Sequence, residues 1–432
     1  MEQMAGEEVR QAMPPKVTTA QWLLVGLLVF SAMINYVDRQ STNVISPMLI
    51  KTFHMNAEQW GWVNSIFALA YIFTSALGGI WVDRVGARKG LLISTAVWSL
   101  AAAGHSLATG FSSLCFWRVM LAAGEGPGGA CLLKGIRQSL PPRLQDSGIG
   151  LVGAGTLLGA LLAPVLVAPL ADKLGWQAAF IITAGLGFIW IPLWIAATRS
   201  PAGRALDPKP VAPGSVAVPS PGLNFRSTGI WATMVAIFFT IPPTVFTLSF
   251  LALYLSDTFG LPVKELAKLQ WQPFLAMDLG QLVAAALLPA LMRSGWSPLS
   301  ARRLVMIAGF GGSTLMLLVS VAPNLAMAMT WLNIARFFFQ FAYVALLAYG
   351  ISCVPAEQAG RMNGLMNACF GACNFVFNPL IGKIADVYHH DYRIVLIMVS
   401  LSPLIGLTAW LALSQRAART GSGTLAPAPA TG

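Results

Sequence analysis

Residues 60–89 read WGWVNSIFALAYIFTSALGGIWVDRVGARK, an uncharged apolar run followed directly by a turn rich in charge. The run from 60 to 82 holds no Asp, Glu, Lys or Arg, whereas 83–89 holds four of them. A helix needs about 20 mainly apolar residues to cross a hydrocarbon core of about 30 Å. The stretch therefore predicts a transmembrane helix over 60–82 that ends in a charged loop at the membrane surface.

Similar apolar runs recur along almost the whole chain. Hydrophobic residues make up 56% of the 432 positions and charged residues 10%, and the mean hydropathy is +0.68. Soluble domains carry roughly 25% charged residues, so this composition excludes a soluble core. The predicted fold class is an all-α membrane protein with twelve transmembrane helices in two six-helix bundles. We expect these helices at 22–46, 60–82, 90–109, 112–135, 147–171, 176–197, 228–256, 268–292, 303–321, 327–352, 362–385 and 393–413.

The net charge of +11 is distributed unevenly between the two sides of the membrane. If both termini lie inside, eighteen of the 27 Lys and Arg residues fall in inner loops and tails, six in outer loops and three within spans. This bias follows the positive-inside rule for cytoplasmic termini. The basic charge is therefore explained by topology, and we expect no nucleic-acid partner.

Motifs for catalysis or metal binding are missing from the sequence. It contains no HExxH, GxSxG or P-loop pattern, so we expect no enzyme activity. Cys369 and Cys373 lie one helical turn apart, but no histidine or carboxylate joins them, and small packing residues are the simpler interpretation. We expect no metal and no cofactor other than a proton as coupling ion.

The chain divides into two related halves. Five segments are predicted: an N-terminal cytoplasmic tail at 1–20, a bundle at 21–198, a Pro-rich cytoplasmic linker at 199–226, a bundle at 227–414 and a C-terminal tail at 415–432. Arg118 in the fourth span has a counterpart 218 positions later in Arg336 of the tenth span. Asp172 and Asp386 end the fifth and eleventh spans in the same way. Matching residues at corresponding positions of the two halves are expected of parallel repeats that surround a site at the middle of the membrane. This repeated organisation favours a carrier over a channel.

A resemblance becomes specific in the turn that follows the second span. Residues 79–89 fit the pattern G-x-x-x-D-R-x-G-x-R-K, which resembles the loop 2–3 signature of the major facilitator superfamily. The resemblance implies a conformational latch in which a carboxylate at a helix end pairs across the interface between the halves. The residues assigned to that latch are Gly79, Asp83, Arg84, Gly86 and Arg88. The corresponding stretch of the second half, 287–292, lacks an acid.

Within that superfamily the chain resembles the anion:cation symporter family, which includes bacterial hexuronate, aldonate and aldarate carriers and animal vesicular glutamate and sialic-acid carriers. The stretches that carry the resemblance are 35–39 (NYVDR), 67–71 (FALAY) leading to 78–79 (GG), 118–127 with its GEGP end, and 273–280 (PFLAMDLG).

Several ionisable residues lie within the predicted spans, where each costs about 2.5–3.5 kcal/mol on insertion scales and therefore needs a partner or a polar pathway. We assign proton coupling to the carboxylates Asp38, Glu125 and Asp278. Arg118 and Glu125 are two helical turns apart and share a face. Asp38 lies at a depth similar to that of Arg118, so we expect these two to pair, which leaves Arg39 free to bind a substrate carboxylate through its planar fork. Static charge pairs that only hold helices together remain the alternative.

The other candidate substrate contacts join Arg39 and Arg118. Family members place an Asn near the ligand in the eleventh span, and this implies a contact for Asn374. Tyr71 would face the same cavity from the second span, and Gln272 would offer an amide to hydroxyl groups. Arg336 is either a substrate contact or one partner of a structural pair.

These features predict a proton-coupled symporter that imports a sugar acid or a related organic anion by alternating access. We expect it to act as a monomer in the lipid bilayer of a bacterial inner membrane. The alternatives are an organic-anion, organophosphate or drug antiporter of the same superfamily, and more remotely a transporter-like receptor.

Overall fold

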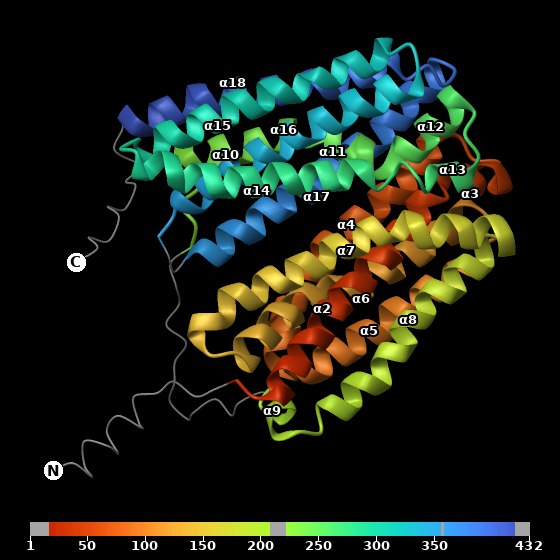
Figure 1. Cartoon of the computed structure of the whole chain (residues 1–432), viewed down its shortest axis with the longest axis vertical. Coiled ribbons are helices and arrows are strands. Elements are labelled where there is room, and N and C mark those ends of the chain that lie inside the picture. The colour runs from red at the N-terminus through yellow and green to blue at the C-terminus, as the bar shows by residue number, and fades with distance from the viewer. Residues whose placement is uncertain (1–16, 208–221, 356–357, 420–432) are drawn as a thin grey trace.

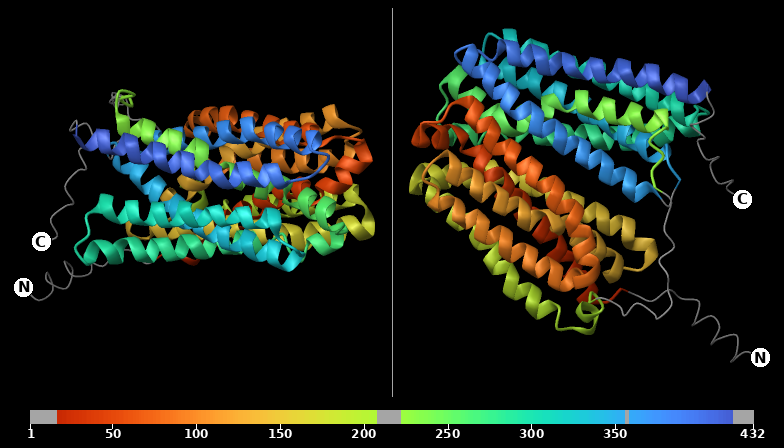
Figure 2. Two further views of the ribbon diagram at one scale, coloured as in Figure 1. Left: turned by 90° about the horizontal axis from the view of Figure 1, so that it is seen from above. Right: turned by 180° about the vertical axis from the view of Figure 1, so that it is seen from behind.

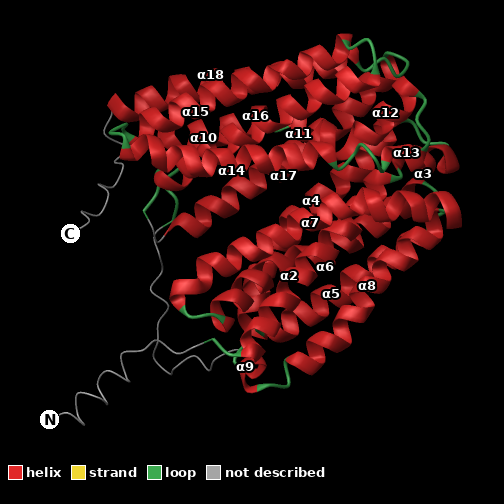
Figure 3. Cartoon of the chain, viewed as in Figure 1, coloured by secondary structure: helices red, strands yellow, loops and turns green. Residues whose placement is uncertain are grey.

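The computed structural model describes residues 17–207, 222–355 and 358–419, and within these ranges the secondary structure is helical, with no strand (Figure 3). Most of each predicted tail and part of the predicted linker lie outside these residues.

The first half is a bundle of six long helices. They are α2 (Thr19–Val44), α4 (Ala57–Val85), α5 (Ala87–Gly104), α6 (Phe111–Ser139), α7 (Pro142–Leu174) and α8 (Trp176–Ala197). Three short elements accompany them, namely α3 (Ser46–Phe53), the 3-10 turn η1 (His105–Leu107) and α9 (Pro201–Arg204).

The second half repeats this plan with more interruptions. Its elements are α10 (Thr228–Thr240), α11 (Pro242–Val245), the π turn η2 (Phe246–Phe250), α12 (Leu251–Phe259), α13 (Val263–Leu266), α14 (Gln272–Arg293), α15 (Pro298–Ser313), the 3-10 helix η3 (Thr314–Val321), α16 (Leu325–Ser352), α17 (Ala359–Val387) and α18 (Arg393–Arg419). The span expected as one helix over 228–256 is broken here. Pro242 and Pro243 lack the N–H that continues a helix, and the backbone passes through a π turn before α12 begins.

Eleven helices in the described part of the chain are long and apolar enough to cross a membrane. Among the long helices of the described residues, α6 falls outside this set; it is 29 residues long and buries Arg118 and Glu125. Glycine brings α6 close to its neighbours, because a Cβ on Gly126 would collide with the Thr74 side chain and the Ser75 backbone of α4. The least apolar long helix of the first bundle is thus packed firmly into it.

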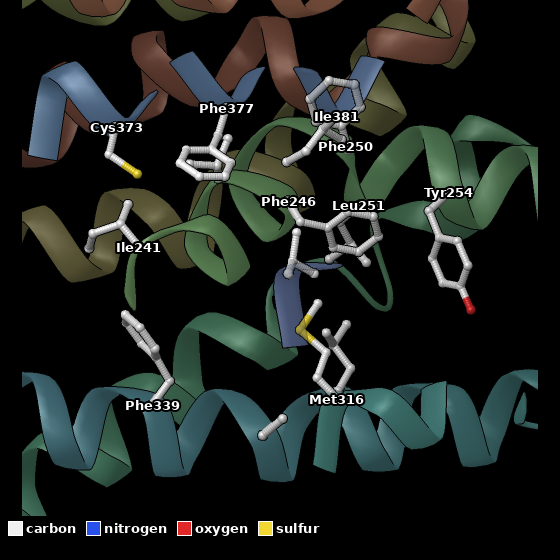
Figure 4. Close-up of a cluster of buried hydrophobic side chains, with 14 of the residues drawn as sticks. Ile241, Phe246, Phe250, Leu251, Tyr254, Met316, Phe339, Cys373, Phe377 and Ile381 are labelled. Carbon is white, nitrogen blue, oxygen red and sulfur yellow. The ribbon is translucent and has the colours of Figure 1, made fainter. Parts of the chain in front are cut away.

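Aromatic and aliphatic side chains fill the core of the second half. Phe246 and Phe250 of η2 are fully buried, and they pack with Phe377 and Ile381 of α17 (Figure 4). Apolar contacts therefore enclose Phe246 and Phe250, the two aromatic residues of the π turn.

The two bundles lie side by side at one end and diverge towards the other (Figures 1 and 2). We call the end where Thr19 and Thr228 lie the tail side, and the end where Ala57 and Val387 lie the far side. The face of α4 that contacts α17 is buried at Ala57, Ser65 and Ala68 but exposed at Ala76, nearer the tail side. On α17, Gly382 and Asn378 are buried whereas Asn367 and Gly364 are exposed. The molecule is closed at its far side and open between the bundles at its tail side.

Candidate functional site

An ion pair between α2 and α6 forms the centre of the site. Nε and Nη2 of Arg39 each lie 2.7 Å from Oε2 of Glu125. The Glu125 side chain is fully buried, whereas the Arg39 side chain keeps 20% of its surface exposed. The other oxygen, Oε1, is buried and has no hydrogen-bond partner among the described residues. Two donors of the guanidinium fork thus converge on a single carboxylate oxygen.

Three aromatic rings surround the Arg39 guanidinium. Its central carbon lies 4.7 Å from the ring centroid of Tyr71, 5.1 Å from that of Tyr36 and 5.4 Å from that of Phe67. Cation–π contacts of this kind contribute about 0.5–2 kcal/mol each, more as water is excluded. The rings hold the cation without neutralising it, so it keeps its capacity to bind an anion.

The second arginine of this bundle, Arg118, is enclosed by neutral groups. It is 1% exposed, and it donates to Oδ1 of Asn64 at 2.5 Å and to the carbonyl of Arg39 at 3.3 Å. Its guanidinium carbon lies 4.9 Å from the centroid of Phe67, a ring that thus contacts both arginines. Full burial argues that Arg118 supports the site from behind rather than contacting a substrate in this conformation.

The expected pairing of Asp38 with Arg118 was wrong. Asp38 is 2% exposed, and neither of its carboxylate oxygens has a hydrogen-bond partner in the described part of the chain. Asp38 and Arg39 lie about 100° apart around their helix, so only one of them can face α6 squarely. Arg39 takes that position, because Gly159 of α7 packs against the Met33 carbonyl and the Tyr36 side chain and thereby sets the rotation of α2.

The second half contributes a buried cation that lacks an acidic partner. Arg336 is fully buried, and its Nη2 lies 3.0 Å from both Oγ1 of Thr244 and Sδ of Met277. Its guanidinium carbon is 4.6 Å from the centroid of Phe339, and its Nε and Nη1 have no partner among the described residues. Asp278 is only partly buried and forms no ion pair there. Asp278 and Arg336 therefore form no ion pair with each other in this conformation.

The predicted amide contacts occupy two different depths. Asn374 is 9% exposed near the middle of α17, and its Nδ2 donates to the Phe370 carbonyl at 2.8 Å. Gln272 is the first residue of α14, at the far side, where it donates to the Lys268 carbonyl and accepts from Asn333 at 3.1 Å. Asn374 lies at a depth comparable to Tyr71 and Glu125, whereas Gln272 belongs to the closed end.

Comparison with known proteins identifies the family. Residues 28–377 match the family model described as Major Facilitator Superfamily. The chain belongs to the major facilitator superfamily. The chain is 27% identical over 370 residues to a hexuronate transporter of Bacillus subtilis, an alignment that covers 83% of this chain and 86% of the relative. It is 25% identical over 421 residues to a D-galactonate transporter of Escherichia coli, covering 93% and 97% of the two chains.

Solved structures confirm the predicted fold class. A bacterial homologue of the human lysosomal transporter Spinster, in an inward-facing and unoccupied conformation, superposes with a TM-score of 0.75 at 16% identity, covering 96% of this chain and all of that one. The relatives and this neighbour are transporters, in agreement with the interpretation that the chain is not an enzyme.

The superfamily's loop 2–3 signature makes its ionic contacts within the first half and with the segment that follows it. Asp83 lies 2.9 Å from Nζ of Lys134 on α6, and Arg88 lies 3.1 Å from Asp207. Gly86, at φ 86°, provides the sharp turn between α4 and α5. Gly79 has open space where a Cβ would lie, and Arg84 is exposed. Among the residues that the structure describes, the expected ion pair of Asp83 across the two halves is not seen, and the halves are apart at the tail side.

Two residues of the site escaped the sequence argument. Asn64 binds Arg118, and Tyr36 packs against Arg39. The signal was present: Asn64, Phe67 and Tyr71 follow helical three- and four-residue spacing, as do Tyr36 and Arg39. Uncharged residues of this kind are common in membrane helices, so their spacing alone does not distinguish them from packing residues.

Proposed function

We propose that this transporter is a proton-coupled symporter that carries a sugar acid of the hexuronate, aldonate or aldarate type. The hexuronate and D-galactonate transporters that align with most of its length support this substrate class. An aldonate or uronate has one carboxylate and several hydroxyls, and such a molecule needs one cation and several neutral hydrogen-bonding groups.

The observation that carries the proposal is the partly exposed Arg39–Glu125 pair. A substrate carboxylate entering from the open tail side competes with Glu125 for the guanidinium fork, which suits bidentate carboxylate binding. If Glu125 takes up a proton, Arg39 is released to the substrate. Protonation of Glu125 and binding of the substrate favour each other. Protonation removes the negative charge that Glu125 would keep without a partner once Arg39 binds the substrate, and the substrate carboxylate pairs with the positive charge that Arg39 would keep without a partner once Glu125 is protonated.

Asp38 is the second proposed proton carrier. A buried carboxylate with no partner pays a desolvation cost of several kcal/mol, whereas the neutral acid needs no counter-cation. Asp278, partly buried on α14, is the third candidate, with a smaller role. Asn374 of the second bundle offers an amide to substrate hydroxyls, and Tyr71 of the first bundle offers its phenol. Arg336 and Gln272 act only if the second bundle rearranges.

The proposed setting is a bacterial inner membrane, with both termini cytoplasmic and the protein acting as a monomer surrounded by lipid. The tail side is then the cytoplasmic side, so the structure represents an inward-open state. Alternating access would return the site to the outside by closing the tail side and opening the far side.

The test is uptake of radiolabelled D-glucuronate or D-galactonate into proteoliposomes with an acidic exterior. Accumulation that a protonophore abolishes is expected, together with counterflow when unlabelled substrate is loaded inside. Counterflow without any response to a pH gradient would refute proton coupling but keep the substrate class. Absence of both, with protein that unfolds cooperatively, would refute the substrate class.

A further inference from the structure

A carboxylate of the second bundle caps a helix of the first bundle at the far side. Oδ1 and Oδ2 of Asp386, near the end of α17, accept hydrogen bonds from the backbone N–H groups of Ala57 (2.9 Å) and Glu58 (2.8 Å), the first two residues of α4. The first N–H groups of a helix have no partner within it, and the helix dipole favours an anion at this position. The contact joins two segments more than 300 residues apart and crosses the interface between the halves.

Glycines allow this contact by bringing the two backbones together. A Cβ on Gly382, one turn before Asp386, would collide with the Ala57 carbonyl, and a Cβ on Gly61 would collide with the Asn378 carbonyl. Farther along the same interface, Ser65 donates to the Phe375 carbonyl at 2.8 Å, and Trp60 donates to the Ser249 carbonyl at 2.7 Å. The halves cannot separate at the far side while Asp386 stays bound to α4.

Other polar residues of the second half surround Asp386. His390 places Nε2 3.9 Å from Oδ1 of Asp386 and Nδ1 2.8 Å from Oδ2 of Asp257 on α12. Tyr392 donates to the same oxygen of Asp257 at 2.9 Å, and burial beside that carboxylate raises the pKa of the Tyr392 phenol well above its usual range, so it remains a donor. These contacts connect α12 and the α17–α18 turn to the cap.

The repeat-related carboxylate makes no such contact. Asp172 ends α7 as Asp386 ends α17, but its side chain is exposed and forms no hydrogen bond or ion pair with other described residues. One member of the repeated pair is thus engaged across the bundles in this conformation, and the other is free.

We propose that Asp386 is a far-side clamp: its cap on α4 stabilises the closed far side, and release of this cap is a required step when the far side opens. It is a positioning residue, because it lies at the opposite end of α17 from the open tail side and away from the Arg39–Glu125 pair. The clamp acts on the equilibrium between conformations and needs no assumption about the transported solute.

The experiment measures the separation of the halves at the far side in the full chain. Spin labels are attached through an unnatural amino acid, which leaves the five native cysteines untouched, at the exposed positions Lys51 on α3 and Arg393 on α18. Pulsed dipolar spectroscopy without substrate should show one dominant short distance in the parent. Asp386→Asn should raise the ratio of long to short distances about tenfold or more, since each bond to a charged acceptor is among the stronger hydrogen bonds.

Three further variants keep the test decisive. Gly382→Ala should shift the distances in the same direction by pressing on Ala57 while the carboxylate remains, and Gly185→Ala, where a Cβ meets open space, is its matched control. Asp172→Asn controls for loss of an acid at a repeat-related helix end. Distances unchanged in both Asp386→Asn and Gly382→Ala would overturn the clamp, and so would an equal shift in Asp172→Asn.

Discussion

Replacing Glu125 by Gln tests the exchange of partners on Arg39 most directly. In the parent protein, a substrate carboxylate that binds Arg39 at high pH must first displace the ionised Glu125, whose single oxygen accepts both 2.7 Å contacts. Hydrogen bonds to charged groups are worth about 1.5–3 kcal/mol. The 20% exposure of Arg39 favours the lower end of that range. Because about 1.4 kcal/mol corresponds to a factor of ten, Glu125→Gln should bind substrate about tenfold more tightly than the parent at high pH.

The sign of the pH dependence follows from the same argument. At low pH a protonated Glu125 already leaves Arg39 free, so the parent and the variant should bind alike. As the pH rises, Glu125 ionises and competes, and the parent's affinity should fall while that of Glu125→Gln stays nearly flat. Accumulation driven by a pH gradient should be lost in the variant, because its binding is no longer linked to a proton at position 125.

The assay is calorimetric titration of purified protein with D-glucuronate or D-galactonate at roughly pH 5 and roughly pH 8, which bracket the range in which functional carboxylates with perturbed environments titrate. Glu265→Gln is the matched control, because Glu265 pairs with Lys268 at an exposed position where ion pairs contribute little. The reasoning is refuted if Glu125→Gln keeps the parental pH dependence, or if it loses binding at both pH values while remaining folded.

Three further experiments test the site and the helix packing beside it. Arg39→Lys keeps the charge but removes the fork, so substrate affinity should fall about tenfold in the same titration; parental affinity would remove Arg39 from the substrate site. Asp38→Asn should abolish uptake driven by a pH gradient but retain exchange, whereas Asp278→Asn should reduce this uptake less. Equal loss of uptake in the two variants would contradict a larger role of Asp38 in proton coupling. Gly126→Ala should destabilise the protein by about 1–3 kcal/mol, because the new Cβ collides with Thr74, whereas a Cβ at the control position Gly129 meets open space and should not destabilise it. Thermal unfolding in detergent compares the two variants. Equal unfolding midpoints would contradict the close packing of α4 against α6.

The sequence predicted the helices well because hydropathy is a property of long segments. The helix expected over 60–82 runs from Ala57 to Val85, and the one expected over 176–197 has those same bounds. Breaks inside a span were harder to foresee. Pro242 and Pro243 marked a weak point, but apolar packing by Phe377 and its neighbours decides that a π turn forms beside them.

The charge pairing could not be derived, for a geometric reason. Position along a span gives the depth of Asp38, Arg39 and Arg118, but their partners depend on the rotation of each helix about its axis. That rotation is set by distant contacts, such as Gly159 against the backbone of α2. Composition therefore identified the residues that need partners, while packing decided which partners they have.

The positions of the charged pair and of the far-side hydrogen bonds suggest how substrate binding is linked to the opening of the two sides. The charged centre, Arg39 with Glu125, lies wholly within the first bundle, so exchanging its partner does not by itself pull the halves together or apart. The hydrogen bonds across the far side are accepted by Asp386 and donated by Ser65 and Trp60; each uses a backbone group as one partner, and none involves Arg39 or Glu125. Something must therefore connect the two bundles at mid-depth when the site is occupied. A substrate whose carboxylate is held by Arg39 and whose hydroxyls reach Asn374 would do so, since it is attached to α2 and α17 at once. Its binding energy would then draw the tail side closed, and the far side would open only when the contacts made by Asp386, Ser65 and Trp60 are released.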